Sequence, residues 1–201
     1  MTTGIVITAA GRGERFIQAG GRGNKLNAGF ADAAGERRSL FEHTLRQALA
    51  SGLPVQVVTR PDNLPVLAAC AANQVPVTLL ASAGLGNSIA AGVAATPHWQ
   101  GWLIHLADMP FVGADVFRQV ADALRQHAIV RPCYAQLPGH PVGFSALLRK
   151  PLANCAAIMA RVNCCKARQC TCCRLSNPAS CRILIFHRNS RPASKFTYAT
   201  S

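Results

Sequence analysis

The first 152 residues alternate short apolar runs with segments of helical periodicity, and this alternation restricts the possible folds more than any other feature. Strands are predicted at residues 5–8, 55–59, 77–80, 102–106 and 129–131, and helices at 39–49, 65–73, 87–95 and 115–126. Strands separated by helices of about ten residues are typical of parallel βαβ units. The sequence therefore predicts an α/β fold with a mostly parallel sheet in a three-layer α/β/α sandwich.

Two of the predicted helices have recognisable starts. Ser39 is the expected N-cap of the helix over 39–49, because Glu42 stands three residues later at the capping-box position. The helix over 87–95 follows a glycine turn, and either Asn87 or Ser88 is expected to cap it. Its N-terminus offers N–H groups to an anion or a base edge. Ordinary capping and close packing of its small residues explain the same sequence without a ligand.

A glycine-containing segment, Thr8-Ala9-Ala10-Gly11-Arg12-Gly13-Glu14-Arg15-Phe16, directly follows the first predicted strand. Small residues let backbone N–H groups close around an anion, and arginine guanidinium groups bind phosphate oxygens. The segment lacks the third glycine of the dinucleotide fingerprint and the Gly-Lys-Ser/Thr of a P-loop. It predicts a nucleotide-binding loop of another type, and a glycine-rich turn without a ligand is the alternative.

A carboxylate, Asp108, follows the apolar strand over 102–106 in the segment Leu106-Ala107-Asp108-Met109-Pro110. Ligands of parallel α/β sheets bind at the carboxyl ends of the strands. A single carboxylate together with substrate phosphates is the usual way in which a protein holds Mg²⁺. Asp108 is therefore expected to bind Mg²⁺ near the glycine loop, the alternative being a simple turn cap. His105, inside the strand, is expected to be a core residue.

Composition separates the chain into two unequal parts. Residues 1–152 contain thirteen Lys/Arg and eight Asp/Glu, whereas residues 153–201 contain eight Lys/Arg, no carboxylate and seven of the nine cysteines. The net charge of +13 is therefore a misleading average. Cys170-x-Cys172-Cys173 lacks the two separated Cys-x₂-Cys pairs of a zinc module, and the tail has few aromatic residues for base stacking. No nucleic-acid partner is expected.

Membrane insertion and export are also not expected from the sequence. No apolar run approaches the ~20 residues that span a bilayer, and the N-terminus lacks a basic segment followed by an apolar stretch. The expected localisation is cytoplasmic, without a membrane partner.

Five ordered motifs within residues 4–150 resemble those of the MobA-like nucleotidyltransferases, and most of all those of molybdenum cofactor cytidylyltransferases. The motifs are Thr8-Ala9-Ala10-Gly11-x-Gly13-x-Arg15-Phe16, Asn24-Lys25-Leu26, Gly86-Asn87-Ser88, Leu106-Ala107-Asp108-Met109-Pro110 and Gly139-His140-Pro141-Val142-Gly143-Phe144. The resemblance implies a Rossmann-like nucleotidyltransferase fold. It also implies transfer of CMP from CTP to the phosphate of molybdenum-molybdopterin, with release of pyrophosphate.

The resemblance further implies a set of roles for individual residues. Arg15, Lys25 and Asp108 would be catalytic, with Asp108 binding Mg²⁺, and His140 and Pro141 would face molybdopterin. The implied nucleotide-binding residues are Thr8, Ala9, Ala10, Gly11, Gly13, Arg15, Lys25, Asn87 and Ser88. A molybdoenzyme or its maturation chaperone is a further implied partner. Relatives that transfer guanylyl groups usually have Ala-Gly-Gly where this chain has Ala9-Ala10-Gly11, which favours cytidine. A guanylyl or sugar-phosphate nucleotidyltransferase and an inactive nucleotide-binding protein are the alternatives.

The sequence after Leu152 departs from the family. The expected G-D-x-G-A-R and D-I-D-T-P segments are absent. With suitable codons for residues 154–165, a shifted reading frame gives L-C-G-D-H-G-A-R-E-L-L, and residues 166–188 then return D-I-D-I-P. We therefore predict a nucleotidyltransferase domain over 1–152 and an out-of-frame tail over 153–201 without a defined fold. If the lost carboxylate is a second metal ligand, the chain is expected to be a weak or inactive enzyme.

Overall fold

The protein is described by a computed structural model that covers residues 2–11, 13, 18, 23–31, 35–81, 84–134, 137–154 and 181–185. In this part of the chain, eight strands form one sheet in the order β10-β7-β9-β6-β1-β4-β5, with β8 paired to β7. The strands of this sheet are β1 Thr3–Ala9, β4 Val55–Thr59, β5 Val77–Leu79, β6 Gly101–Leu106, β7 Ile129–Tyr134, β8 Leu137–Pro138, β9 Val142–Ser145 and β10 Cys181–Ile185. A separate antiparallel pair consists of β2, Gly29–Ala31, and β3, Arg37–Ser39.

The predicted α/β class with a mostly parallel sheet is confirmed. Strand β1 pairs in parallel with both β4 and β6, and β4 pairs in parallel with β5. The five predicted strands all occur, within three residues of the expected ends. The helical segments are η1 Lys25–Asn27, α2 Leu40–Leu49, α3 Leu64–Ala72, α4 Leu85–Ala95, α5 Ala114–Ala123, η2 Ala146–Leu148 and α6 Arg149–Ala153.

Strand β9 is antiparallel to both β6 and β7, and the sequence did not predict it. It is only four residues long and contains Gly143, a residue that weakens a strand pattern. A Cβ atom at Gly143 would lie 2.9 Å from Val120 Cγ1, so glycine is required for α5 to pack closely on the sheet. The glycine that close packing requires is thus also the residue that makes this strand difficult to predict from the sequence.

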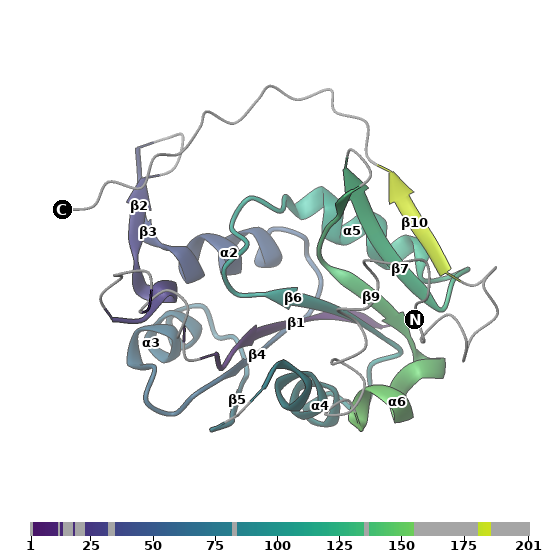
Figure 1. Ribbon diagram of the computed structural model, residues 1–201, viewed down its shortest axis with the longest axis horizontal. Helices are drawn as coiled ribbons and strands as arrows, with labels where there is room; N and C mark the ends of the chain where they lie inside the picture. The colour runs from purple at the N-terminus through teal and green to yellow at the C-terminus, as the bar shows by residue number, and fades with distance from the viewer. Residues whose placement is uncertain are drawn as a thin grey trace.

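Helices cover both faces of the sheet, as expected for three layers. Helices α2 and α5 lie on one side and α4 and α6 on the other (Figure 1). The first face buries a cluster that includes Ile5, Ile7 and Phe117, and the second buries Val6, Ile104 and Trp102. Alternate residues of β1 thus enter opposite cores, as the period of two in a strand requires.

The helix starts confirm one prediction and correct another. Ser39 caps α2 in a complete capping box, with its hydroxyl accepting from the Glu42 amide. Helix α4, however, begins at Leu85 with Gly84 as N-cap, so neither Asn87 nor Ser88 caps it. The glycine turn itself supplies the extended backbone that an N-cap requires, and the helix therefore starts two residues earlier than predicted.

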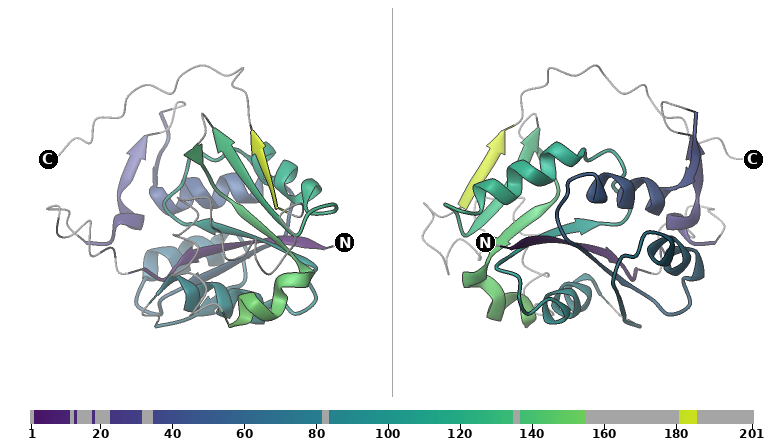
Figure 2. Two further views of the ribbon diagram at one scale, coloured as in Figure 1. Left: turned by 45° about the vertical axis from the view of Figure 1, so that its right-hand side comes forward. Right: turned by 180° about the vertical axis from the view of Figure 1, so that it is seen from behind.

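The described part of the tail consists of the end of α6, at Ala153 and Asn154, and one strand. Strand β10 pairs in parallel with β7 at the edge of the sheet (Figure 2). The prediction that the tail has no defined fold otherwise falls on residues 155–180 and 186–201, which lie outside the described residues. In the described part of the chain, no helix is long and apolar enough to cross a membrane.

Candidate active site

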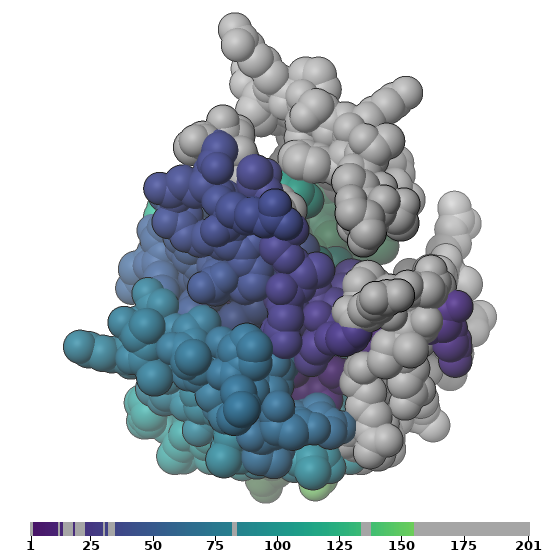
Figure 3. All heavy atoms as spheres, turned by 90° about the vertical axis from the view of Figure 1, so that its left-hand side faces the viewer, coloured from purple at the N-terminus to yellow at the C-terminus, as the bar shows by residue number. Residues whose placement is uncertain are grey.

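The carboxyl ends of β1 and β6 lie next to each other, and this adjacency creates the candidate site. Thr8 pairs with Leu106 across the parallel ladder, so Ala10 and Asp108 leave the sheet at the same level. Figure 3 faces the side of the molecule toward which β1 points, with the purple N-terminal segment near the middle of the surface. The predicted meeting of the glycine segment with the Asp108 turn therefore exists in the fold.

Lys25 reaches Asp108 from the short helix η1. The Asn24 side chain caps this helix by accepting a hydrogen bond from the Leu26 amide at 3.0 Å, and the Leu26 side chain is buried in the core. Lys25 stands between these two anchors, and its Nζ lies 2.8 Å from Asp108 Oδ2. The two side chains are 38% and 35% exposed, so both remain accessible to a ligand.

The glycine segment borders this ion pair. Gly13 has a φ of +65°, and a Cβ atom placed there would lie 3.9 Å from the Lys25 amide nitrogen. A left-handed backbone is strained for most other residues, so the turn requires glycine at this position. Arg15 and Arg12 lie outside the described residues, and the predicted roles of these arginines stay predictions.

The three residues before Gly11 are buried, which limits how they can contact a ligand. Ala9 and Ala10 are at most 2% exposed, and the Thr8 hydroxyl donates to the His105 carbonyl oxygen at 3.2 Å. In this conformation the Thr8 side chain is committed to the fold. Any contribution of these residues to nucleotide binding would therefore come from their backbone.

Hydrogen bonds from two neighbouring elements hold the turn that carries Asp108. The Ala107 amide donates to the Thr8 carbonyl oxygen at 3.3 Å, and the Met109 amide closes the turn on the Leu106 carbonyl oxygen at 3.3 Å. The Thr44 hydroxyl in α2 lies 2.9 Å from the Ala107 carbonyl oxygen. Sequence reasoning missed Thr44, although a polar residue among the apolar positions of an amphipathic helix was a usable signal.

The two predicted residues in α4 differ in accessibility. Asn87 is exposed in the first turn of the helix, whereas Ser88 is 3% exposed and its hydroxyl lies 3.4 Å from the Gly84 carbonyl oxygen. Both residues are on the helix that packs against β1 and β4. Of the two, Asn87 has the side chain that can reach a ligand without rearrangement.

His140 lies on the other side of Asp108, in the loop that enters β9. Its peptide bond to Pro141 is cis, and its ring centroid is 6.3 Å from that of His105. Burial, followed by the nearby Arg131 guanidinium, lowers the pKa of His140, while Asp108 acts in the opposite direction. The ring is therefore neutral at pH 7 and can exchange hydrogen bonds with a ligand without carrying charge.

Arg131 lies beside the His140 loop, and sequence reasoning did not assign it a role. Arg131 Nε donates to the Gly139 carbonyl oxygen at 2.9 Å, which fixes its guanidinium beside the His140 loop. His105 is fully buried and contacts Phe117 edge to face, as expected for a core residue. Burial, with a smaller effect of His140, lowers the pKa of His105 to about 3.

The donor set around Asp108 suits a metal ion that arrives with a nucleotide. Among the described residues, no group of three or more His, Cys, Asp or Glu side chains could enclose a metal. Asp108 offers one half-exposed carboxylate at the edge of the sheet. This arrangement fits Mg²⁺, which retains water and takes oxygens from phosphates, better than it fits a metal that needs an all-protein cage.

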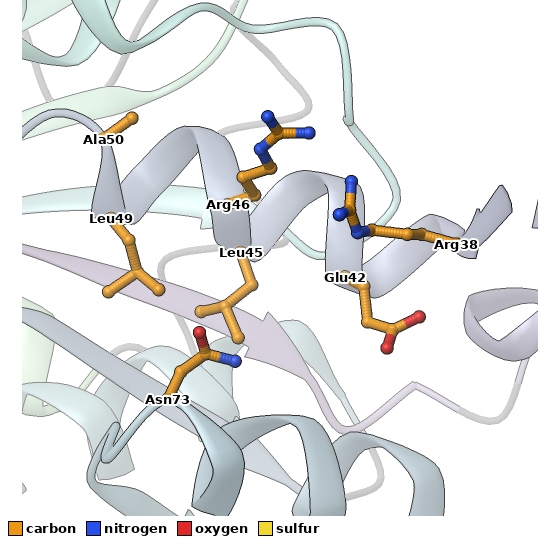
Figure 4. A pocket seen from close by; sticks show the side chains of 7 residues that line it. All are labelled: Arg38, Glu42, Leu45, Arg46, Leu49, Ala50 and Asn73. Atoms are coloured by element: carbon orange, nitrogen blue, oxygen red, sulfur yellow. The ribbon is translucent and has the colours of Figure 1, made fainter. Parts of the chain in front are cut away.

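A hollow lies beside α2, and neither Lys25 nor Asp108 lines it. Figure 4 shows Leu45, Leu49 and Asn73 facing one another beneath the helix. Its charged residues already have protein partners, because Glu42 accepts from the Ser39 amide and Arg46 lies 3.7 Å from Glu36. The hollow therefore has the features of a packing groove between α2 and the end of α3.

Solved structures share this fold at low sequence identity. Rv0371c of Mycobacterium tuberculosis H37Rv, solved in complex with manganese, is 20% identical with a TM-score of 0.71, covering 92% of this chain and 89% of that one. A 4-diphosphocytidyl-2C-methyl-D-erythritol synthase of Anaerococcus prevotii DSM 20548 is 16% identical with a TM-score of 0.62, covering 92% and 86%. A CMP:2-keto-3-deoxy-manno-octonic acid synthetase complexed with CTP is 14% identical with a TM-score of 0.61, covering 92% and 90%.

Sequence comparison gives the family. No curated protein sequence matches the chain significantly. The family model of the MobA-like NTP transferase domain matches residues 5–167, which include the glycine segment, Lys25, Asp108 and His140. Because this match covers most of the chain and the sheet has the corresponding nucleotidyltransferase fold, the protein belongs to the MobA-like NTP transferase domain family.

Proposed function

We propose that this protein transfers CMP from CTP to the terminal phosphate of molybdenum-molybdopterin and releases pyrophosphate. The observation that carries the proposal is the Lys25–Asp108 pair, with 2.8 Å between Nζ and Oδ2, beside Gly13 at the carboxyl ends of β1 and β6. A cation, a carboxylate and a tight glycine turn are the groups that a metal-bound triphosphate requires. The acceptor is proposed from the motif set over residues 4–150, which resembles that of molybdenum cofactor cytidylyltransferases.

The proposed reaction needs positioning and charge neutralisation but no protein nucleophile. An oxygen of the acceptor phosphate attacks the α-phosphorus of CTP in line, and the bond from that phosphorus to the bridging oxygen breaks as pyrophosphate departs. Both reactants are anions. Lys25, Arg15 and the backbone N–H groups between Ala9 and Gly13 would reduce their repulsion and stabilise the leaving group. Mg²⁺ held by Asp108 would supply Lewis-acid stabilisation of the same phosphates.

Lys25 has two successive partners in this proposal. Without nucleotide, its ammonium group pairs with Asp108. When a triphosphate enters, Lys25 would turn to a phosphate oxygen and release the carboxylate for the metal. Asp108 would thus lose the lysine and gain the metal ion, so its carboxylate would have a cationic partner in both states.

Two groups near β9 are suited to an acceptor that carries a phosphate. Arg131 supplies a fixed positive charge, and it is oriented by its 2.9 Å hydrogen bond to the Gly139 carbonyl oxygen. His140, whose lowered pKa keeps its ring neutral, would add a hydrogen bond. Asp108 lies between these groups and the glycine segment, so donor and acceptor phosphates would meet beside it.

Cytidine as the base is supported by the Ala9-Ala10-Gly11 segment. Of the structurally similar proteins, one is named as a 4-diphosphocytidyl-2C-methyl-D-erythritol synthase and another was solved in complex with CTP. Mg²⁺ as the metal is supported by the single carboxylate, which is the donor set expected for this ion. The structurally similar Rv0371c was solved in complex with manganese. Mn²⁺ is therefore chosen as a probe for the metal site proposed here.

The test is a pyrophosphate-release assay with molybdenum-molybdopterin as acceptor and Mg²⁺ with CTP, GTP or ATP in turn. We expect release with CTP and formation of molybdopterin cytosine dinucleotide, identified by mass spectrometry. Preference for GTP, or turnover only with a sugar phosphate, would replace the proposed substrates within the same family. Saturable CTP binding without pyrophosphate release would instead identify an inactive nucleotide-binding protein.

A further inference from the structure

Thr44 is a buried hydroxyl residue in the middle of α2, on the face that packs against the sheet. It is fully inaccessible to solvent and lies among Phe41, Leu45 and Ala48 of the same helix. Its Oγ1 is 3.0 Å from the Leu40 carbonyl oxygen and 2.9 Å from the Ala107 carbonyl oxygen. A hydroxyl at such a position is unexpected, because valine would fill a similar volume without burying a polar group.

The two acceptors do not depend equally on this hydroxyl. A threonine hydroxyl donates one hydrogen, so it serves one acceptor at a time. The Leu40 carbonyl is four residues before Thr44 and therefore accepts the regular helical bond from the Thr44 amide. The Ala107 carbonyl lies in a turn, and in the described part of the chain Thr44 is its hydrogen-bond donor. Leaving a buried carbonyl unpaired is destabilising, so the bond to Ala107 is the one that matters.

The Ala107 carbonyl belongs to the same planar peptide unit as the Asp108 amide. Fixing the direction of that carbonyl fixes the plane, and the plane places the nitrogen and Cα atoms of Asp108, from which its side chain departs. The preceding amide is already held by the Thr8 carbonyl oxygen. Bonds from β1 and α2 thus hold opposite sides of Ala107, and the next side chain reaches Lys25 at 2.8 Å.

We propose that Thr44 is a positioning residue that aims the Asp108 carboxylate at the metal-bound triphosphate. This inference rests on the proposed function for the role of Asp108, and it adds a residue from the helix layer to the site. Thr44 touches neither substrate nor metal. It acts by holding one peptide plane.

The experiment measures how much a divalent cation strengthens nucleotide binding to the full chain. The probe is a CTP analogue with a methylene group between the α- and β-phosphates. It is titrated into the protein in a calorimeter, once in the presence of Mn²⁺ and once in the presence of EDTA. The ratio of the two affinities is the metal-dependent gain. We expect Thr44→Val to reduce this gain at least fivefold while the affinity in EDTA changes less than twofold. Thr44→Ser, which keeps the hydroxyl, should retain the gain within twofold.

Thr96→Val is the matched control for lost stability. Thr96 is also a buried helix-associated threonine, and its hydroxyl donates to the Gly92 carbonyl oxygen at 2.9 Å and accepts from Trp102 Nε1 at 3.0 Å. It is remote from Asp108, so its loss should lower the melting temperature without changing the metal-dependent gain. An unchanged gain in Thr44→Val, or an equal fall in Thr44→Val and Thr96→Val, would overturn the inference.

A second measurement separates this inference from the proposed function. If the wild-type chain has no metal-dependent gain, the assigned metal role of Asp108 fails, but the hydrogen bond to Ala107 can still be tested. The ¹H–¹⁵N resonance of the Asp108 amide should shift in Thr44→Val and return close to its wild-type position in Thr44→Ser. An Asp108 amide that is the same in all three proteins would show that Thr44 does not orient this peptide.

Discussion

Residues 1–152 and residues 153–201 follow different sequence rules. The first region mixes thirteen basic with eight acidic residues and alternates strand and helix patterns, whereas the second has eight basic residues, no acidic residue and no such alternation. In the first region the predicted strands formed within three residues of their expected ends. In the second, the described structure consists of the end of α6 at Ala153 and Asn154 and the strand β10 beside β7. A binary pattern matched to secondary structure is thus what made the first region predictable.

The described residues of the candidate site all belong to the first region. Lys25, Asp108, Thr44 and His140 come from four separate segments, and the sheet order brings their elements together. The family's later carboxylate motif would come from the second region, where this chain has none.

Asp108→Asn should lower kcat for cytidylyl transfer about 10³-fold, because it removes the carboxylate that would hold the metal at the phosphates. Steady-state pyrophosphate release with CTP and molybdenum-molybdopterin is the measurement. Asp122→Asn is the control, since Asp122 is an exposed residue of α5 that pairs with Arg125 at 3.5 Å. Turnover by Asp108→Asn near the wild-type rate would show that Asp108, and with it the proposed site in the first region, is not needed for catalysis.

Restoring the alternative reading frame after residue 152 should raise kcat about 10²-fold, since it returns a carboxylate motif that we expect to be a second metal ligand. Both chains would be assayed at equal concentrations of folded protein, judged by circular dichroism. A restored chain in which that carboxylate is changed to the amide should fall back to the rate of the present chain. Equal turnover of the present and restored chains would contradict the idea that the second region lost catalytic information.

Lys25→Met should weaken the binding of metal-free CTP about tenfold, because the ammonium group that meets the phosphates is lost while the apolar stem is retained. Lys25→Arg keeps the charge and should recover most of that affinity. Isothermal titration with CTP in EDTA reports the change directly. A CTP affinity independent of residue 25 would mean that Lys25 serves Asp108 alone.

Lowering the pH from 7 to 5 should cost about 2 kcal/mol of unfolding free energy through His105. Its pKa is about 3 in the folded protein against 6.5 for an ordinary histidine, mainly because of burial. The unfolded chain therefore binds the proton first, and stability is present above pH 6.5 and is lost as the pH falls toward 3. His140, whose pKa is also lowered, acts in the same direction.

Urea unfolding at both pH values would measure this effect in the wild type and in His105→Leu. The leucine variant should lose about 2 kcal/mol less between pH 7 and pH 5, since it removes the titrating group but keeps an apolar contact for Phe117. An identical pH dependence in the two proteins would show that His105 is not the group that destabilises the fold in acid.

Several features of the site could be predicted because they depend on local sequence. The order of strand, glycine segment and Asp108 turn is written in the chain, and parallel strands place their carboxyl ends at one edge. Ser39 and Glu42 likewise indicated the start of α2, because together they form a capping box. The cap of α4 was missed because Gly84, Asn87 and Ser88 are all acceptable N-caps, and only the packed helix selects Gly84.

Contacts between distant segments could not be predicted in the same way. The Lys25–Asp108 pair joins residues 83 positions apart, and the Thr44–Ala107 bond joins residues 63 apart. Nothing local to Thr44 indicates a partner in the turn after β6. Arg131 could likewise not be predicted as a site residue. It comes close to His140 only because β9 lies between β6 and β7 in the sheet.

The sequence by itself determined the α/β class, the elements of the first region and the chemistry available at the ends of β1 and β6, because hydrophobic period, capping residues and small-residue turns act over a few neighbouring positions. Only the tertiary structure decided that the Ala107 carbonyl accepts from Thr44, that Asp108 pairs with Lys25, and that Arg131 lies beside the His140 loop. Those relations depend on the order of strands in the sheet and on which helix face is buried, and both are settled by packing the whole domain at once.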